Sequence, residues 1–221
     1  MEIEHCLFPD ELLYDPENNT WLRPNVDREV IVGIASVLSA IAGRFTQVKL
    51  RKPGTTIQKG HSLGTLETPK FVGPMPSPIT GKVQAINGLV VANPKVLNDS
   101  PYEEGWIARI EPSNFQTERD LLLDVWKAEH ILRDKITQFR ARCFKAFPDH
   151  EMVEIGVECS AVLVKLNELV SIIPSGDVVH IVSDDPTAYV EMVRWTDQTG
   201  NPLVEWRTEG GYFHFIVKKA L

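Results

Sequence analysis

Apolar positions follow three different patterns along this chain of 221 residues. Residues 65–68 and 79–83 are short segments bounded by turn-forming residues, which indicates β-strands. Between residues 121 and 143, apolar side chains recur at steps of three and four, the spacing of one buried helix face. After Pro148, strand-like and helix-like segments alternate. The pattern predicts a first part with strands, then a long helix, then a mixed part.

The long helix is expected to begin at Thr117-Glu-Arg-Asp120, a capping box that can satisfy the free amides of a first turn. Pro148 ends the pattern. The expected apolar stripe is Leu121, Val125, Ala128, Leu132, Ile136, Phe139 and Cys143. We expect Cys143 to be a small core residue of this stripe. The same seam could pair two copies of the chain, because its spacing is that of a coiled-coil face.

The alternation of strand-like and helix-like segments after Pro148 predicts the element order β-α-β-α-β-β. Such an order suggests a two-layer sandwich with helices on one face of a sheet. The expected elements are a strand through Val153, Ile155 and Val157, a helix from Cys159, a strand over 178–182, a helix over 187–199, and a hairpin of residues 203–208 and 212–218 around Gly210-Gly211.

Cys159 is expected at the start of the first helix of this last part. Unpaired amides at a helix start carry partial positive charge, which favours the thiolate and lowers the pKa of a thiol there. A thiolate can act as a nucleophile or accept sulfur. Cys6, Cys143 and Cys159 form no Cys-x-x-Cys pair, so at least one thiol must be free.

Lys70 lies ten residues after Gly60 and eleven before Gly81, the spacing of a hairpin that displays one amine at its tip. Prolines at 69, 74, 76 and 78 fix φ and remove amide donors around it. We interpret Lys70 as a tether that a modifying enzyme can reach. The alternative is an ordinary solvated lysine in a proline-rich loop.

This stretch resembles the glycine-cleavage H-protein family of lipoyl-bearing carriers, whose pattern runs Gly, Glu-x-x-Lys, strand, Gly. Glu67 stands three residues before Lys70, and further matches give a resemblance over about residues 12 to 112. The further matching motifs are Asn18-Asn-Thr-Trp21, Val30-Ile-Val-Gly33, Asn87, and Asn98-Asp-Ser-Pro101-Tyr102-Glu-Glu-Gly105-Trp106. The resemblance implies covalent lipoate on Lys70, attached by a lipoate ligase or another lipoyl-attaching enzyme.

The residues beside the lysine depart from that family. Pro69 precedes Lys70, and Phe71 and Val72 follow it where the family has small residues. An apolar side chain such as Phe71 at a turn tip is expected to meet a partner surface or to fold onto the arm.

The last part resembles the TusA family of sulfur carriers. Cys159, Gly176 and Asp184-Asp-Pro186 keep that family's intervals. The resemblance implies a persulfide on Cys159 and transfer of its sulfur to partner proteins. Ser160 and Val162 replace the prolines of the family's Cys-Pro-x-Pro motif. A partner-binding domain without sulfur chemistry is the alternative.

Together these features predict an α+β protein with two domains joined by a long helix. Residues 1–115 are expected to form an H-protein-like lipoyl carrier domain of the barrel-sandwich hybrid type. Residues 116–148 are expected to form the connecting helix, and residues 149–221 the TusA-like domain.

Charge and composition narrow the partners. Residues 151–221 carry 11 acidic and 5 basic side chains, so we expect no nucleic-acid partner. The chain shows no targeting segment, no membrane-spanning stretch and no histidines at metal-ligand spacing, so we expect a cytoplasmic protein without a metal.

The favoured function is a non-catalytic carrier serving sulfur transfer, with lipoate on Lys70 and sulfur on Cys159. One alternative is a glycine-cleavage carrier of aminomethyl groups with an inert C-terminal appendage. A second alternative is a sulfurtransferase enzyme acting through Cys159, and a third is a structural adaptor. The partners would accordingly be sulfur-transfer or glycine-cleavage proteins.

Overall fold

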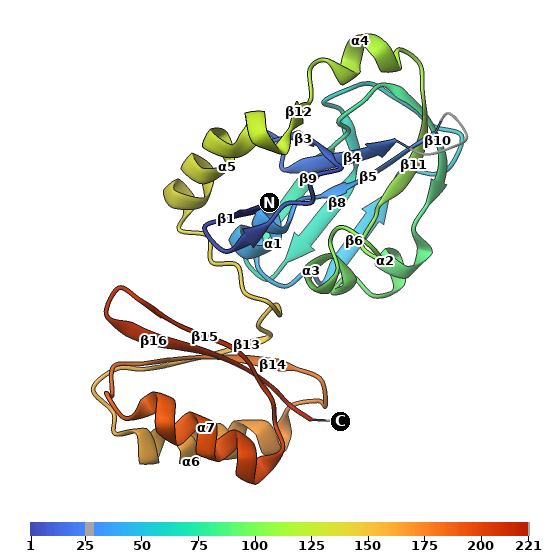
Figure 1. Cartoon of the computed structure of the whole chain (residues 1–221). Helices are drawn as coiled ribbons and strands as arrows, with labels where there is room; N and C mark the ends of the chain where they lie inside the picture. The colour runs from blue at the N-terminus through green and yellow to red at the C-terminus, as the bar shows by residue number, and fades with distance from the viewer. Residues whose placement is uncertain (25–28, 221) are drawn as a thin grey trace. The chain divides into compact units, whose positions relative to one another are not determined.

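The computed structural model describes residues 1–24 and 29–220 (Figure 1). The chain divides into two compact units, Met1–Cys143 and Phe144–Leu221. The predicted two-domain α+β fold is confirmed, with a sheet-rich first unit and a β-α-β-α-β-β second unit.

The first unit is built from two main antiparallel sheets. A seven-stranded sheet has the order β12-β3-β4-β5-β11-β10-β7, and a three-stranded sheet has the order β6-β8-β9. The strands of the large sheet are β3 (Leu13–Asp15), β4 (Thr20–Pro24), β5 (Val30–Ile34), β7 (Thr56–Ile57), β10 (Gly81–Ile86), β11 (Ala108–Pro112) and β12 (Leu123–Asp124). Those of the small sheet are β6 (Gln47–Leu50), β8 (Ser62–Thr68) and β9 (Phe71–Pro76).

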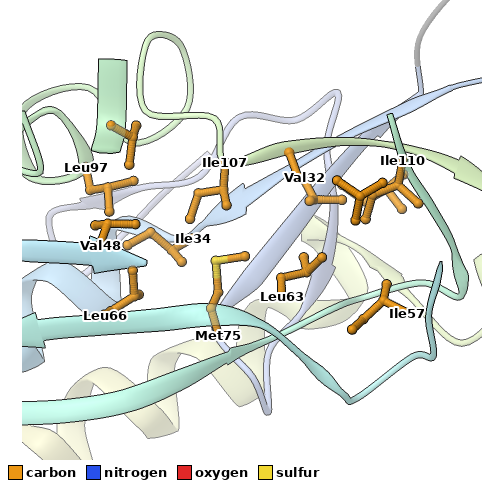
Figure 2. Close-up of a cluster of buried hydrophobic side chains, with 14 of the residues drawn as sticks. Val32, Ile34, Val48, Ile57, Leu63, Leu66, Met75, Leu97, Ile107 and Ile110 are labelled. Atoms are coloured by element: carbon orange, nitrogen blue, oxygen red, sulfur yellow. The ribbon is translucent and has the colours of Figure 1, made fainter. Parts of the chain in front are cut away.

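Aliphatic side chains from both sheets share one core. Val32 and Ile34 of β5 pack with Leu63 and Leu66 of β8 and with Met75 of β9 (Figure 2). These side chains are all buried, and such burial is the main favourable contribution to folding. The shared core holds the small sheet, and with it the predicted lysine hairpin, against the large sheet.

The predicted hairpin is present, but its second strand begins earlier than predicted. Residues 71–76 form β9 directly after the turn, whereas the sequence predicted a strand only from Ile79. Pro74 and Pro76 therefore lie within a strand instead of stiffening a loop. Because β9 is an edge strand, it can contain prolines without breaking interior hydrogen bonds.

The long helix is shorter than predicted and lies within the first unit. A short helix α4 (Phe115–Arg119) and strand β12 come first, and α5 then runs over Val125–Phe139. The predicted start at Thr117 was wrong: Asp124 caps α5 by accepting a hydrogen bond from the Lys127 amide at 3.0 Å. The other helices described in the first unit are α1 (Ser36–Ala42), α2 (Gly88–Ala92) and α3 (Val96–Asp99).

The buried face of α5 matches the centre of the predicted stripe. Its buried residues are Val125, Ala128, Leu132 and Ile136. They join a second core with Trp21, Tyr14 and Phe8. The ends of the stripe were predicted wrongly, because Leu121 and Phe139 are exposed.

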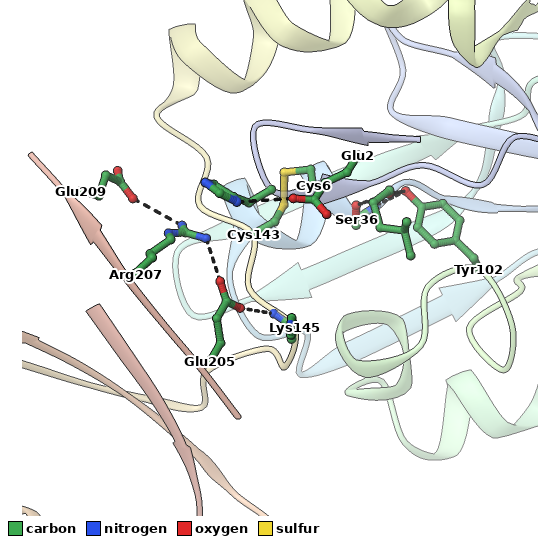
Figure 3. Close-up of a disulfide and its surroundings, with 11 residues drawn as sticks. Glu2, Cys6, Ser36, Tyr102, Cys143, Lys145, Glu205, Arg207 and Glu209 are labelled. Atoms are coloured by element: carbon green, nitrogen blue, oxygen red, sulfur yellow. Dashed lines mark hydrogen bonds and ion pairs between the residues drawn. A yellow bond between two sulfur atoms is a disulfide. The ribbon is translucent and has the colours of Figure 1, made fainter. Parts of the chain in front are cut away.

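Cys143 is not a member of the helix stripe. It lies beyond the end of α5 and forms a disulfide with Cys6 of the short strand β2 (Cys6–Leu7), which pairs with β1 (Glu2–Ile3) (Figure 3). Cys143 is buried in the same core as the inner face of α5, as expected of a small core residue, but its predicted place in the helix stripe was wrong. Cys159 is the one free cysteine, so the predicted free thiol is present.

The second unit has the predicted element order, but its first strand was placed wrongly. The strand predicted through Val153, Ile155 and Val157 ends at Glu154, and Met152 is its buried residue, whereas Val153 and Ile155 are exposed. Its sheet has the order β13-β14-β16-β15, with β13 parallel to β14 and the other pairs antiparallel. Helices α6 and α7 lie on one face of this sheet (Figure 1). The elements are β13 (His150–Glu154), α6 (Cys159–Ile172), β14 (Val178–Ser183), α7 (Ala188–Thr199), β15 (Leu203–Glu209) and β16 (Tyr212–Lys218).

Candidate functional site

Lys70 is the second residue of a two-residue turn between β8 and β9. Thr68 pairs with Phe71, which leaves Pro69 and Lys70 as the loop. Both loop residues are exposed, and the Lys70 ammonium makes no hydrogen bond or ion pair with residues that the structure describes. The site thus presents one primary amine that a second protein can reach, which suits an amide bond to a carboxylic acid such as lipoate.

Hydrogen bonds of the Thr68 side chain fix the backbone of the turn that carries this amine. The Thr68 hydroxyl donates to the Ala42 carbonyl at 2.8 Å and accepts from the Lys70 amide at 3.2 Å. Buried Asn98 in turn donates to the Gly43 carbonyl at 3.0 Å and accepts from the Phe45 amide at 2.9 Å. A chain of contacts therefore runs from Asn98 through the loop after α1 to the lysine turn.

Other residues of the quoted motifs also build the framework. The Trp21 indole donates to the Ile34 and Pro101 carbonyls, and its ring fills the space where a side chain at Gly33 would lie. The Tyr102 hydroxyl donates to the Leu7 carbonyl at 2.8 Å. These hydrogen bonds join segments of the first unit that lie far apart in the sequence.

Two apolar residues follow the lysine. Phe71 is 36% exposed and Val72 is 68% exposed. They belong to β9, so they lie on opposite faces of the strand. The structure therefore places one apolar side chain on each face of the hairpin next to Lys70.

Cys159 is the first residue of α6, as predicted, but its environment differs from the prediction. The residue is 3% exposed and belongs to the core of the second unit with Val162, Leu166 and Ala188. Burial, together with the carboxylates of Asp185 and Glu191, raises the pKa of the Cys159 thiol to about 11. The predicted lowering of this pKa by the helix start was wrong.

Asp185 explains why the helix start does not favour a thiolate. Its carboxylate accepts from the Cys159 amide at 2.7 Å and from both the amide and the hydroxyl of Thr187, also at 2.7 Å. These hydrogen bonds, first of all the one from the Thr187 side chain, lower the pKa of Asp185. One negative carboxylate therefore occupies the positive ends of α6 and α7 and lies beside the sulfur.

The contacts that support both sites were not recognised in the sequence. Asn98 and Asp185 stand in motifs that the sequence analysis quoted, yet their partners lie far away in the chain. Thr68 gave no signal of its own beyond its place in a strand. Lys70 and Cys159 lie in different units.

Within residues 1–24 and 29–220, no group of three histidine, cysteine or acidic side chains is arranged to hold a metal ion. In the same residues, no helix is long and apolar enough to cross a membrane.

Comparison with known proteins identifies the first unit. Residues 12–135 match the family described as Glycine cleavage H-protein, which is more than half of the chain. The chain belongs to the glycine cleavage H-protein family. Proteins of this family carry covalently attached lipoate. The second unit matches the family described as Sulfurtransferase TusA over residues 155–219.

Relatives of this H-protein family member include glycine cleavage system H protein 5 of Aquifex aeolicus, which is 33% identical over 64% of this chain and 98% of the relative. A probable glycine cleavage system H protein 2 of Sulfolobus acidocaldarius is 34% identical over 63% of this chain and 94% of its own length. A solved glycine cleavage system H protein from Mycobacterium marinum is 28% identical, with a TM-score of 0.45, over 48% of this chain and 87% of that protein.

Proposed function

We propose that this protein is a carrier that bears lipoate on Lys70 and serves sulfur transfer. The observation that carries the proposal is the single free amine at the apex of the β8–β9 hairpin, in a chain of the glycine cleavage H-protein family. The exposed turn offers the amine, and the contacts through Thr68 and Asn98 fix the backbone that presents it. The proposed role of the chain is therefore to display the lipoyl arm and to deliver the group that the arm carries. In this proposal the chain catalyses no reaction itself.

The pathway is inferred from the second unit. Lipoate would supply a dithiol–disulfide pair able to carry a transferable group. The TusA match adds a sulfur-carrier module to the same chain, and a shared chain raises the local concentration of one carrier near the other to about millimolar. We therefore favour sulfur transfer over glycine cleavage with an inert appendage.

The attachment site is tested by intact mass. The full chain is incubated with a purified lipoate ligase, lipoate and ATP, beside the variants K70R and K59R. We expect one lipoyl increment on the wild type and on K59R, and none on K70R. Lys59 is a matched control because its ammonium already donates to the Pro78 carbonyl at 3.0 Å. An unmodified wild type, or a modified K70R, would overturn the proposal.

Sulfur carriage at Cys159 is a second proposed function of the same chain. The TusA match supports it, whereas the burial of the thiol and its raised pKa mean that little thiolate exists at neutral pH. We propose that a partner must open the start of α6 before sulfur can be loaded.

This second function is tested by persulfide-selective labelling of the full chain. The protein is exposed to inorganic polysulfide, with C159S as the control. All proteins carry C6S/C143S, because hydrosulfide in the polysulfide would open that disulfide to a further persulfide. We expect slow labelling of Cys159 in the native protein, faster labelling after mild denaturation, and none when C159S is added. A native protein that stays unlabelled would leave only the glycine-cleavage role or the adaptor role.

Cytoplasm is the proposed location, where lipoyl attachment and sulfur transfer would meet their partners. The disulfide between Cys6 and Cys143 is a feature that a reducing cytoplasm disfavours. Alkylation of protein isolated rapidly from cells, followed by mass measurement, shows whether Cys6 and Cys143 are two thiols or a disulfide in the cell.

A further inference from the structure

The tip of the lysine hairpin contains an aromatic ring that lies over a glycine. A methyl group built at Gly73 would lie 2.9 Å from Cε2 of Phe71 and 3.0 Å from Cε1, and still closer to Cζ. All three atoms belong to the far end of the ring. The Phe71 ring therefore leans along its own strand over Gly73, while the residue remains 36% exposed.

Gly73 matters for this arrangement because it leaves room for the ring, and not because its backbone needs a conformation reserved for glycine. It does not have a positive φ, so any residue could adopt its conformation. It lies opposite Leu66 of β8 and two residues from Met75, both of which belong to the core. Residues 71, 73 and 75 share one face of β9, the face on which Met75 enters that core.

The ring and the glycine thus form a matched pair next to the amine. An aromatic ring over a glycine in an edge strand replaces the packing that the missing side chain would provide. Here the aromatic residue is also the neighbour of Lys70 in a loop of only two residues. Fixing the ring in one position restrains the backbone that carries the lysine.

We propose that Phe71, seated on Gly73, is a positioning residue for lipoyl attachment at Lys70. The inference deepens the proposed function and rests on it. Phe71 holds the turn in the conformation in which Lys70 enters the attaching enzyme. Without the seated ring, the turn samples further conformations, and a smaller fraction of molecules presents the amine correctly. This mixture of turn conformations lowers the apparent affinity of the lipoyl-attaching enzyme for the protein that carries Lys70.

The test is a double-mutant cycle on the full chain. Acceptor kinetics of a purified lipoate ligase, with lipoate and ATP, are measured for F71A, G73A and F71A/G73A by intact mass. Two controls accompany them. F71Y keeps a ring that can seat on Gly73, and V72A shortens the exposed side chain on the opposite face.

We expect F71A and G73A each to raise the KM for the acceptor about threefold to tenfold with little change in kcat. The double variant should be no worse than F71A alone, because removal of the ring leaves room for a methyl group at position 73. F71Y should behave as the wild type, and V72A should change KM less than either. Additive effects of the two substitutions, or an unchanged KM in G73A, would overturn the proposal.

A measurement on unmodified protein separates this inference from the proposed function. Amide hydrogen exchange at Lys70 and Phe71 should be faster in F71A and G73A than in the wild type, while exchange in α5 stays the same. If the wild type accepts no lipoate, the attachment proposal fails, yet the exchange data still test the ring. If exchange at the tip is equal in all variants, Phe71 does not position the turn.

Discussion

At the scale of single residues, burial and then the Asp185 carboxylate limit how reactive the free cysteine Cys159 can be. A helix start should stabilise a thiolate, but Asp185 accepts the Cys159 amide hydrogen and brings its own negative charge beside the sulfur. Burial acts in the same direction, because a charged sulfur loses solvation in an apolar core. The balance favours the neutral thiol, which is a poor nucleophile.

The substitution D185N tests this balance. Asparagine keeps an oxygen that can accept the Cys159 amide hydrogen but removes the charge, so the pKa of Cys159 should fall from its value of about 11. Alkylation requires the thiolate, so at pH 8 the D185N protein should react roughly three- to tenfold faster, and its rate should level off at a lower pH.

The control for this prediction is D184N. Asp184 accepts from the Gly156 amide at 2.8 Å and does not contribute to the raised pKa of Cys159. Its substitution should leave the pH profile of alkylation unchanged. A wild-type thiol that titrates below pH 8.5, or a D185N profile shifted upward, would contradict the argument about Asp185.

At the scale of elements, the sequence predicted best where local signals agree with packing. Most elements of the second unit were found because Gly176, Asp184-Asp-Pro186 and Gly210-Gly211 mark ends and turns that a short segment determines by itself. The start of the long helix was predicted wrongly because Leu123 and Asp124 pair with the distant strand β3 and so separate α4 from α5. A local capping pattern at Thr117 does not report this pairing, and Asp124 caps α5 instead.

The candidate sites show the same division. The turn around Lys70 is local, so spacing and prolines located it, although the strand through Pro74 was not recognised because edge position depends on the order of strands. The support of Thr68 by Ala42 joins segments 26 residues apart. The burial of Cys159 depends on side chains of two helices and a sheet, which no pattern near the cysteine reports.

At the scale of the whole molecule, the disulfide closes most of the first unit into a loop. Cys6 and Cys143 are 137 residues apart, and together they join the N-terminal hairpin β1–β2 to the segment that follows α5. Closing so long a loop removes many conformations from the unfolded chain. The second unit lies outside this loop, so the bond should stabilise one unit and leave the other unchanged.

Reduction of the protein, or the double variant C6S/C143S, should therefore lower the free energy of unfolding of the first unit by about 2–4 kcal/mol. In a calorimetric scan the transition of residues 1–143 should move to lower temperature, and that of residues 144–221 should stay in place. C159S removes the free thiol and keeps the disulfide, so it should show the same sensitivity to reductant as the wild type. Hydrogen exchange assigns each transition to its unit. If reductant shifts neither transition, or shifts only that of the second unit, loop closure by Cys6 and Cys143 does not contribute to the stability of the first unit.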